Sequence, residues 1–231
     1  MTNKYGPRIV TDGLVLALDA ADKNSYSGSG SGWYDLSGND NNGTLINGVG
    51  YNANNGGSLV FDGINDYVSI NSSIGLNPNK ISLSCWIMFN GGLNSRVIFC
   101  GKGDGQSDAT TQYWLEKTSI NFFTIYMSIN NIGTYLNLTS IPVVLNAWYN
   151  IVAVFDGFTV TGYINGIKQP QSTSRTGSII TTNTIFSIGR IGTYGGLYTN
   201  CNIPICQIYN IPLSDSEILQ NYNATKSRYN L

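Results

Sequence analysis

The chain has 231 residues, with 12 lysines and arginines against 13 acidic residues and a formal net charge of −1 at pH 7. Charged residues make up only 11% of it, too few for the basic surface that a phosphate backbone requires, so we expect no nucleic-acid partner. It contains no histidine, which removes the commonest general base and the commonest metal ligand. A chain of this length fits one all-β domain, which we place over residues 1–231.

The N-terminal segment carries no export or membrane signal. Residues 1–8 are mostly polar, and the apolar run after them ends at Asp19, which is too short for a membrane span and wrongly flanked for a signal peptide. If the chain is complete, we therefore expect no membrane insertion, synthesis in the cytoplasm without a signal peptide and, if the protein leaves the cell, release by lysis.

Alternating apolar residues predict strands along most of the chain. In chain order we expect them at residues 13–18, 58–61, 67–70, 81–89, 96–100, 112–116, 122–129, 148–155, 158–164, 184–188 and 205–209. The dipeptides Asp156-Gly157 and Asn165-Gly166 supply the positive φ angles of tight hairpin turns, which makes residues 148–169 a three-stranded meander. Asp62-Gly63 predicts a further turn.

The remaining segments predict loops and one helix. Residues 24–55 are rich in Gly, Ser and Asn, which indicates long surface loops. Ser214 and Glu217 have the spacing of a capping box, so a helix is expected over about residues 214–224. The fold class is therefore all-β, with a core over about residues 10–213 and one short C-terminal helix.

Four cysteines, Cys85, Cys100, Cys201 and Cys206, are too few for a disulfide scaffold, and none has the CxxC spacing of a zinc site. We expect most of these cysteines to be buried, to pack like small hydrophobic residues and to keep their thiols reduced. If Phe89 and Arg96 close a hairpin, its register places Cys85 opposite Cys100 on one sheet face. A strained disulfide between them would then be sterically allowed after lysis.

Several motifs follow one another in a recognisable order: FDGINDYV at residues 61–68, ISLSCWI at 81–87, WYNIVAVFDG at 148–157 and YING at 163–166. Together with the closing residues 208–224, they resemble laminin G-like jelly-roll domains of the concanavalin A-like lectin and glucanase superfamily. The opening residues 13–20 and 33–39 resemble the variant of these domains found in virion proteins of tailed bacteriophages. The resemblance implies a two-sheet antiparallel jelly-roll sandwich.

The resemblance also makes a structural calcium ion the cofactor to consider, because related domains often hold one with Asp carboxylates and backbone carbonyls. Asp19, Asp62 and Asp66 are the candidate ligands. The alternative, which the turn chemistry favours, is that Asp62 and Asp66 bind backbone amides of a glycine-containing turn. Residues 203–207 lack the acidic residue that the family commonly shows in its last core strand, which weighs against the ion.

Catalysis is not expected. Glycoside hydrolases of this fold place two carboxylates on one strand face, whereas Glu116 and Glu217 are the only glutamates of this chain and Glu217 belongs to the predicted helix cap. No predicted strand carries acidic residues two or four positions apart. We therefore expect a protein that is not an enzyme.

The candidate ligand-binding residues lie in predicted loops. Aromatic rings stack on sugars or partner side chains, and amides supply directional hydrogen bonds; the residues that combine these properties are Trp33, Tyr34, Asn39, Asn41, Tyr194 and Tyr198. For Trp33 the favoured alternative is that it plugs the edge of the sandwich.

Three function classes are compatible with these observations. We expect first a structural, decoration or adhesion protein of a tailed-phage virion, whose partners are other capsid or tail proteins. The alternative is a lectin-like module that binds a host surface glycan, and a glycoside hydrolase ranks third. The missing export signal and the phage-like motifs favour the first class.

Overall fold

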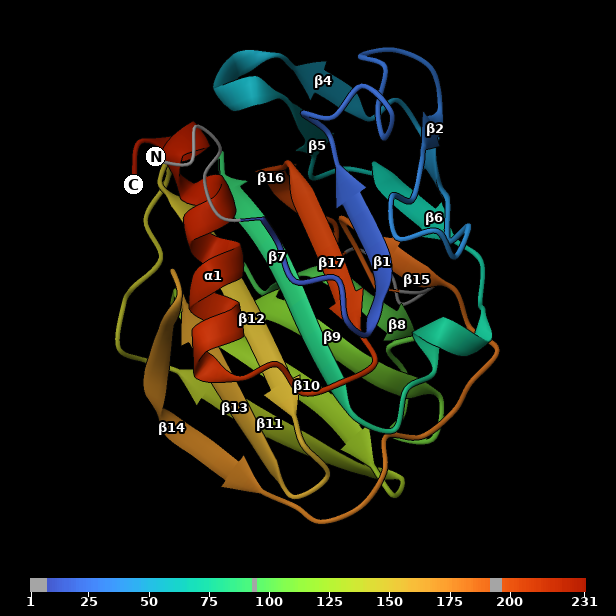
Figure 1. Cartoon of the computed structure of the whole chain (residues 1–231), viewed down its shortest axis with the longest axis vertical. Helices are drawn as coiled ribbons and strands as arrows, with labels where there is room; N and C mark the ends of the chain where they lie inside the picture. The colour runs from blue at the N-terminus through green and yellow to red at the C-terminus, as the bar shows by residue number, and fades with distance from the viewer. Residues whose placement is uncertain (1–7, 93–94, 192–196) are drawn as a thin grey trace, which may run out of the picture.

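The computed structural model describes residues 8–92, 95–191 and 197–231. It confirms the predicted jelly-roll sandwich of two antiparallel sheets with one short C-terminal helix (Figure 1). No helix in the described part of the chain is both long and apolar enough to cross a membrane.

The first sheet has nine strands and contains both the predicted meander and the predicted strand at residues 205–209. Its main order is β14 (Ile167–Ser174), β13 (Thr159–Ile164), β12 (Trp148–Phe155), β7 (Ile81–Phe89), β16 (Asn200–Ile203), β5 (Ser58–Asp62) and β4 (Gly50–Asn52). In addition to β16, β7 pairs with β17 (Ile205–Tyr209). The strand β17 in turn pairs with β1 (Leu14–Asp19), so the sheet branches at β7.

The second sheet has eight strands and lies behind the first in Figure 1. Their order is β11 (Ile132–Leu138), β10 (Phe123–Ile129), β9 (Thr111–Lys117), β8 (Val97–Gly103), β15 (Phe186–Ile188), β6 (Tyr67–Ile70), β3 (Gly43–Ile46) and β2 (Gly32–Trp33). Short 3-10 helices lie at η1 (Asn54–Gly56), η2 (Ile74–Leu76) and η3 (Lys226–Tyr229).

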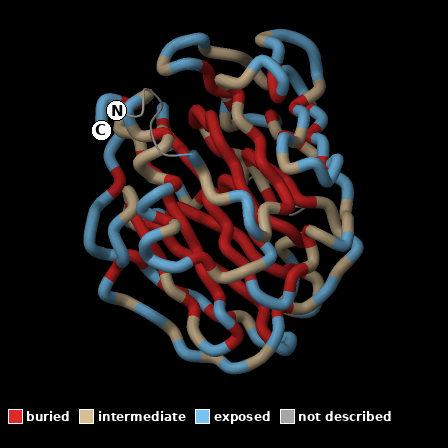
Figure 2. The backbone as a smooth tube through the Cα atoms, viewed as in Figure 1, coloured by how far each residue is buried: buried red, intermediate tan, exposed pale blue. Residues whose placement is uncertain are grey.

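The main core lies between the two sheets, where Figure 2 shows the buried residues concentrated in the strands. The alternation predicted for β7 is confirmed, because Ile81, Leu83, Cys85, Ile87 and Phe89 all belong to this core. Since successive strand residues point to opposite faces, their polar and aromatic neighbours face outward.

The helix α1 (Asp215–Thr225) covers the outer face of the first sheet over β7 and β12 (Figure 1). The predicted capping box is present: the Ser214 side chain accepts a hydrogen bond from the Glu217 amide, and the Glu217 carboxylate accepts one from the Ser214 amide. Trp86 of β7 stacks on Tyr222 of the helix, with ring centroids 5.6 Å apart. The helix is therefore fixed by a cap and an aromatic contact.

The edge strands β11 and β14 come from different sheets and contact each other. Thr173 Oγ1 donates to the Tyr135 carbonyl oxygen at 3.1 Å, and Gln171 Nε2 donates to Thr139 Oγ1 at 3.0 Å. The sandwich is therefore closed along this side by direct contacts between the two sheets.

The predicted hairpin between Phe89 and Arg96 is wrong, because β7 belongs to the first sheet and β8 to the second. Cys85 is paired with Cys206 of β17 instead of with Cys100. The strands on either side of Asp62-Gly63 likewise belong to different sheets. Both segments carry the chain across the sandwich, which an alternating pattern cannot reveal.

Two lysines are fully buried. The Lys102 ammonium group donates to Ser72 Oγ at 3.0 Å and to the carbonyl oxygens of Thr182 and Thr184 at 3.1 and 2.5 Å. Lys117 donates to the Ser95 carbonyl oxygen at 2.6 Å. Burial disfavours the charged form and lowers the pKa of each lysine to about 8.

Each buried lysine is predicted to add to the free energy of unfolding between pH 8 and pH 10. In this range a lysine of the unfolded chain, with an ordinary pKa of about 10.4, binds more protons than the same lysine of the folded chain. We expect a contribution on the order of 1 kcal/mol for each lysine. The buried thiols of Cys85, Cys100 and Cys201, whose pKa values burial raises, act in the opposite direction over this range. The contribution is therefore measured by urea denaturation as a difference: the slope of the free energy of unfolding against pH should be more positive in the native chain than in Lys102→Met, and equal slopes would contradict the prediction.

Candidate functional site

Two of the predicted ligand-binding residues are buried. Trp33 has no exposed surface and packs in the main core, as the favoured alternative for this residue expected. Asn41 is buried, and its Nδ2 donates to the Val15 carbonyl oxygen at 2.6 Å. The prediction that these two side chains contact a ligand is corrected, because neither has surface to offer.

The other predicted ligand-binding residues do not converge. Tyr34 is 56% exposed, and the exposed Asn39 donates to the Leu14 carbonyl oxygen at 3.2 Å. Tyr198 is half-buried and accepts a hydrogen bond from Arg190 at 3.3 Å. Tyr194 lies outside the described residues. Within the described ranges no hydrogen bond or ring contact joins Tyr34 or Asn39 to Tyr198.

The candidate calcium ligands lie in two places. Asp62 Oδ1 accepts hydrogen bonds from the Ile64 and Asn65 amides at 2.7 and 3.3 Å, and Asp66 Oδ2 accepts one from the Asp62 amide at 3.2 Å. These are the hydrogen bonds to backbone amides that the turn interpretation predicted for Asp62 and Asp66. Asp66 Oδ1 is buried without a partner, and burial raises the pKa of Asp66.

Asp19 belongs to a separate ion pair, with both carboxylate oxygens 2.8 Å from Arg228 Nη1. Among the described residues no three carboxylates lie close enough to share an ion. Two carboxylates in one turn fall short of the about six to eight oxygen ligands that calcium takes. Calcium stays a prediction, and this geometry does not fit it.

A surface of different composition lies on the outer face of the second sheet. Three aromatic residues, one from each of β9, β10 and β11, are in register: Trp114 pairs with Tyr126, and Tyr126 pairs with Tyr135. We call these residues the aromatic row. Trp114 and Tyr126 stack with centroids 3.9 Å apart, and Tyr126 lies 5.0 Å from Tyr135. The first two rings are buried, whereas Tyr135 is 52% exposed.

The loop before β9 fixes the aromatic row. Asp108 Oδ1 accepts a hydrogen bond from the Tyr126 hydroxyl at 2.7 Å, and its Oδ2 accepts one from the Gly133 amide at 2.8 Å. Burial raises the pKa of Tyr126 and Tyr135, and the Asp108 charge raises both further. The two hydroxyl groups therefore keep their protons at neutral pH and remain hydrogen-bond donors.

A small cavity of about 70 Å³ opens at this row and is lined in part by Asp108, Trp114, Tyr126 and Tyr135. The Trp114 indole Nε1 is buried and has no hydrogen-bond partner within the described structure. An unpaired buried donor is costly, and this nitrogen has no surface that a ligand could contact.

A second row of side chains, the polar row, runs beside the first and consists of Glu116, Thr124 and Asn137. Arg96 Nη2 and Nε lie 2.6 and 2.9 Å from Glu116 Oε2, and the Arg96 guanidinium lies 5.4 Å from the Trp114 ring centroid. Thr124 Oγ1 donates to Asn137 Oδ1 at 2.8 Å. An exposed ring thus lies next to amide, guanidinium and carboxylate groups.

A larger groove of about 540 Å³ lies over β1 and β17, between residues of the C-terminal segment and Leu36. The Asp19–Arg228 pair lines it. None of the described residues that line it is aromatic, and the charges of Asp19 and Arg228 neutralise each other. The aromatic row is therefore the better candidate for ligand stacking.

Trp114 and Tyr126 lie in strands that were predicted from the sequence, whereas the strand that carries Tyr135 was not predicted. The dipeptide Asn130-Asn131 could have indicated this strand, because two consecutive asparagines favour a tight hairpin turn. Both residues have positive φ angles, of 53° and 60°. Two such residues form the tight turn of a hairpin between β10 and β11. Recognising it would have placed Tyr135 beside Tyr126.

Comparisons with known proteins agree with this architecture. The family model of the concanavalin A-like lectin/glucanases superfamily matches residues 62–219. A comparison with curated protein sequences finds no relative.

Among solved structures, the binding domain of Paraclostridial Mosquitocidal Protein 1 is 17% identical with a TM-score of 0.73, over 93% of this chain and 52% of that one. Domain 4 of the arabinanase AbnA from Geobacillus stearothermophilus, in complex with arabinotriose, is 17% identical with a TM-score of 0.67, over 90% and 98%. The binding domain of Botulinum Neurotoxin DC in complex with SialylT is 15% identical with a TM-score of 0.72, over 93% and 52%.

The chain thus spans about half the length of the two toxin binding domains and nearly all of the arabinanase domain. At these identities the likeness shows the fold alone. The family match covers more than half of the chain and includes most strands of both sheets. The chain therefore belongs to the concanavalin A-like lectin/glucanases superfamily.

Proposed function

We propose that this chain is a carbohydrate-binding domain that holds a sugar at the aromatic row without hydrolysing it. The observation that carries the proposal is the exposed Tyr135 ring, held in place by two buried rings and lying next to the polar row. Sugar rings stack their C–H faces on such aromatic surfaces, and neighbouring polar groups bind the hydroxyls.

The proposed binding mode assigns a task to each group. Tyr135 provides the stacking surface, and its hydroxyl, whose pKa is raised by burial and by the charges of Asp108 and Glu116, donates a hydrogen bond. Asn137 is exposed and its Nδ2 makes no hydrogen bond among the described residues, so it is free to donate to a sugar oxygen. The small cavity lined by Trp114 and Tyr135 offers room for one hydroxyl group beside the exposed ring.

Two resemblances of fold support a sugar as the ligand. The arabinanase domain was solved with arabinotriose and the neurotoxin binding domain with SialylT. For this chain we propose only the same class of ligand, a sugar. Sequence identities of 15–17% are too low to assign binding roles to individual residues.

The absence of catalysis is part of the proposal. Glu116 is held by Arg96, and both oxygens of Asp108 accept hydrogen bonds from the protein. Glycoside hydrolysis requires two carboxyl groups, one acting as the general acid and the other as the base or nucleophile. Glu116 and Asp108 are each engaged by other protein groups and are not placed as such a pair. Turnover of any polysaccharide that disappears in Glu116→Gln would contradict this part.

Tyr135→Ala is expected to weaken sugar binding about 5-fold or more, because loss of a stacking ring costs on the order of 1 kcal/mol or more. A glycan array identifies the sugar, and isothermal titration calorimetry measures the Kd. Tyr34→Ala is the matched control, since it removes an exposed tyrosine elsewhere. Equal weakening in both variants, or no glycan bound by the native chain, would overturn the proposal.

A position on a tailed-phage particle is the finer proposal, and it rests on the sequence motifs at residues 13–20 and 33–39. A nearly neutral surface lets identical domains stand close together without repelling each other. Mass spectrometry of purified particles from the source of this chain tests the idea. Particles that lack the chain would contradict it while leaving sugar binding intact.

A further inference from the structure

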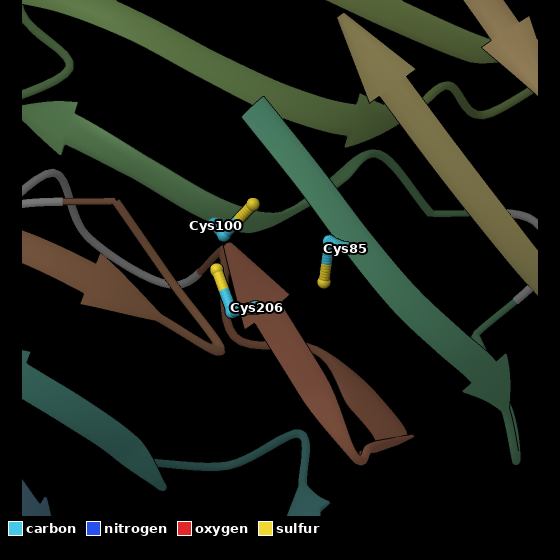
Figure 3. Close-up of side chains that lie close together, drawn as sticks. All are labelled: Cys85, Cys100 and Cys206. Carbon is cyan, nitrogen blue, oxygen red and sulfur yellow. The ribbon is translucent and has the colours of Figure 1, made fainter. Parts of the chain in front are cut away.

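Three of the four cysteines meet in the core. Cys85 of β7 and Cys206 of β17 are paired across neighbouring strands of the first sheet, and Cys100 of β8 faces them from the second sheet (Figure 3). Their sulfur atoms all lie within 4.8 Å of one another. None of the three residues has exposed surface.

The surroundings of these sulfur atoms are apolar. Their strand partners outside the group are aliphatic, namely Leu18, Leu115, Ile151 and Ile188. The nearby Tyr113 hydroxyl already donates to the Leu76 carbonyl oxygen at 2.9 Å. Backbone groups supply the other polar contacts: Cys85 Sγ donates to the Trp86 carbonyl oxygen at 3.6 Å, and Cys100 has a backbone hydrogen bond with Leu115.

The three thiols also interact with one another. Burial raises the pKa of Cys85 and Cys100. Burial acts in the same direction on Cys206, but hydrogen bonds from Cys100 and Cys85 outweigh it and lower the pKa of Cys206. Cys206 is therefore the thiol of the group that loses its proton most readily.

We propose that Cys85, Cys100 and Cys206 form a three-sulfur site for a soft monovalent cation, Cu(I), which links the two sheets. Metal–sulfur bonds of about 2.3 Å around one central ion place the sulfur atoms about 4 Å apart, so the observed group needs little adjustment. Thiolate ligands select Cu(I) and exclude the hard ions calcium and magnesium. Zinc takes a fourth ligand, and the described neighbours supply none.

Binding converts three thiols and one Cu(I) into a complex with two thiolates and one thiol, and it releases two protons to water. The copper stays Cu(I), so no electron is transferred. Because the sulfur atoms have no exposed surface, the ion enters while the chain folds. A ligand that binds only the folded state then stabilises it.

The test refolds the full chain without oxygen in the presence of one equivalent of Cu(I), followed by gel filtration. We expect about one copper ion per chain by elemental analysis and a rise in Tm of roughly 5 °C. Cys206→Ala and Cys100→Ala should each lose the copper and the rise in Tm. Cys201→Ala is the matched control, because Cys201 is equally buried but does not belong to the group.

Circular dichroism establishes that each variant has folded, and Cys85→Ala replaces any variant that has not. The proposal is overturned if the native chain retains no copper, or if Cys201→Ala loses as much copper as Cys206→Ala. Sugar binding is independent of this site, so either proposal can fail without the other.

Discussion

Trp33→Ala is expected to lower the free energy of unfolding by about 3–5 kcal/mol, a large share of the stability of a domain. Trp33 is fully buried in the main core, although β2 contains only two residues. Its ring therefore anchors the adjoining loops, and alanine would leave a cavity. Urea denaturation followed by circular dichroism measures the change.

Two further variants separate packing from ligand contact. Trp33→Phe should retain most of the stability, because Trp33 Nε1 makes no hydrogen bond with the described residues that phenylalanine would lose. Tyr34→Ala should change the free energy of unfolding by less than about 0.5 kcal/mol, since this side chain is exposed. Loss of sugar binding in a stable Trp33→Ala protein would show instead that Trp33 contacts the ligand.

Gly101→Ala is expected to cost roughly 1–3 kcal/mol and to weaken sugar binding as well. A Cβ atom at Gly101 would lie 2.5 Å from the Trp114 Cβ, 2.7 Å from the Tyr113 carbonyl oxygen and 2.8 Å from Ile191 Cδ1. Relief of these contacts requires Trp114 to move. Because Trp114 supports Tyr126 and through it Tyr135, the displacement reaches the exposed ring of the aromatic row.

Gly50→Ala is the control for this substitution. Gly50 lies in β4, where the nearest atom to an added Cβ is Val60 Cβ at 3.5 Å, an ordinary contact. We expect its stability and sugar affinity to stay close to those of the native chain, measured by urea denaturation and calorimetry. A Gly101→Ala protein with native affinity would mean that the aromatic row does not hold the ligand.

Elements with strong local signals were predictable from sequence. The meander of β12, β13 and β14 follows from Asp156-Gly157 and Asn165-Gly166, and α1 follows from the Ser214–Glu217 capping box. In both cases the residues that specify the conformation are adjacent in the chain. Local chemistry alone then decides the outcome.

Strand partners were less predictable because they are set by packing between distant segments. Cys85 and Cys100 lie in consecutive predicted strands, yet those strands belong to opposite sheets. The aromatic row could not be predicted for the same reason. Trp114 and Tyr126 were placed in strands, but only the strand register shows that they are neighbours. Sequence pattern also favours loop aromatics as ligand contacts, which is why Trp33 was considered although it is buried.

The contact between β11 and β14 has a consequence for solubility. An open sheet edge exposes unpaired amide and carbonyl groups that recruit strands of other molecules and start aggregation. Here the long edges of both sheets lie against each other, and Pro170 in β14 lacks the N–H that an incoming strand would need. Of the remaining edges, β2 and β4 are only two and three residues long. The longer edge strand β1 is covered by the loop at residues 35–41, where Asp35 accepts a hydrogen bond from the Ala17 amide and Asn41 donates one to the Val15 carbonyl oxygen. The chain is thus suited to remain dispersed even where many copies are crowded together.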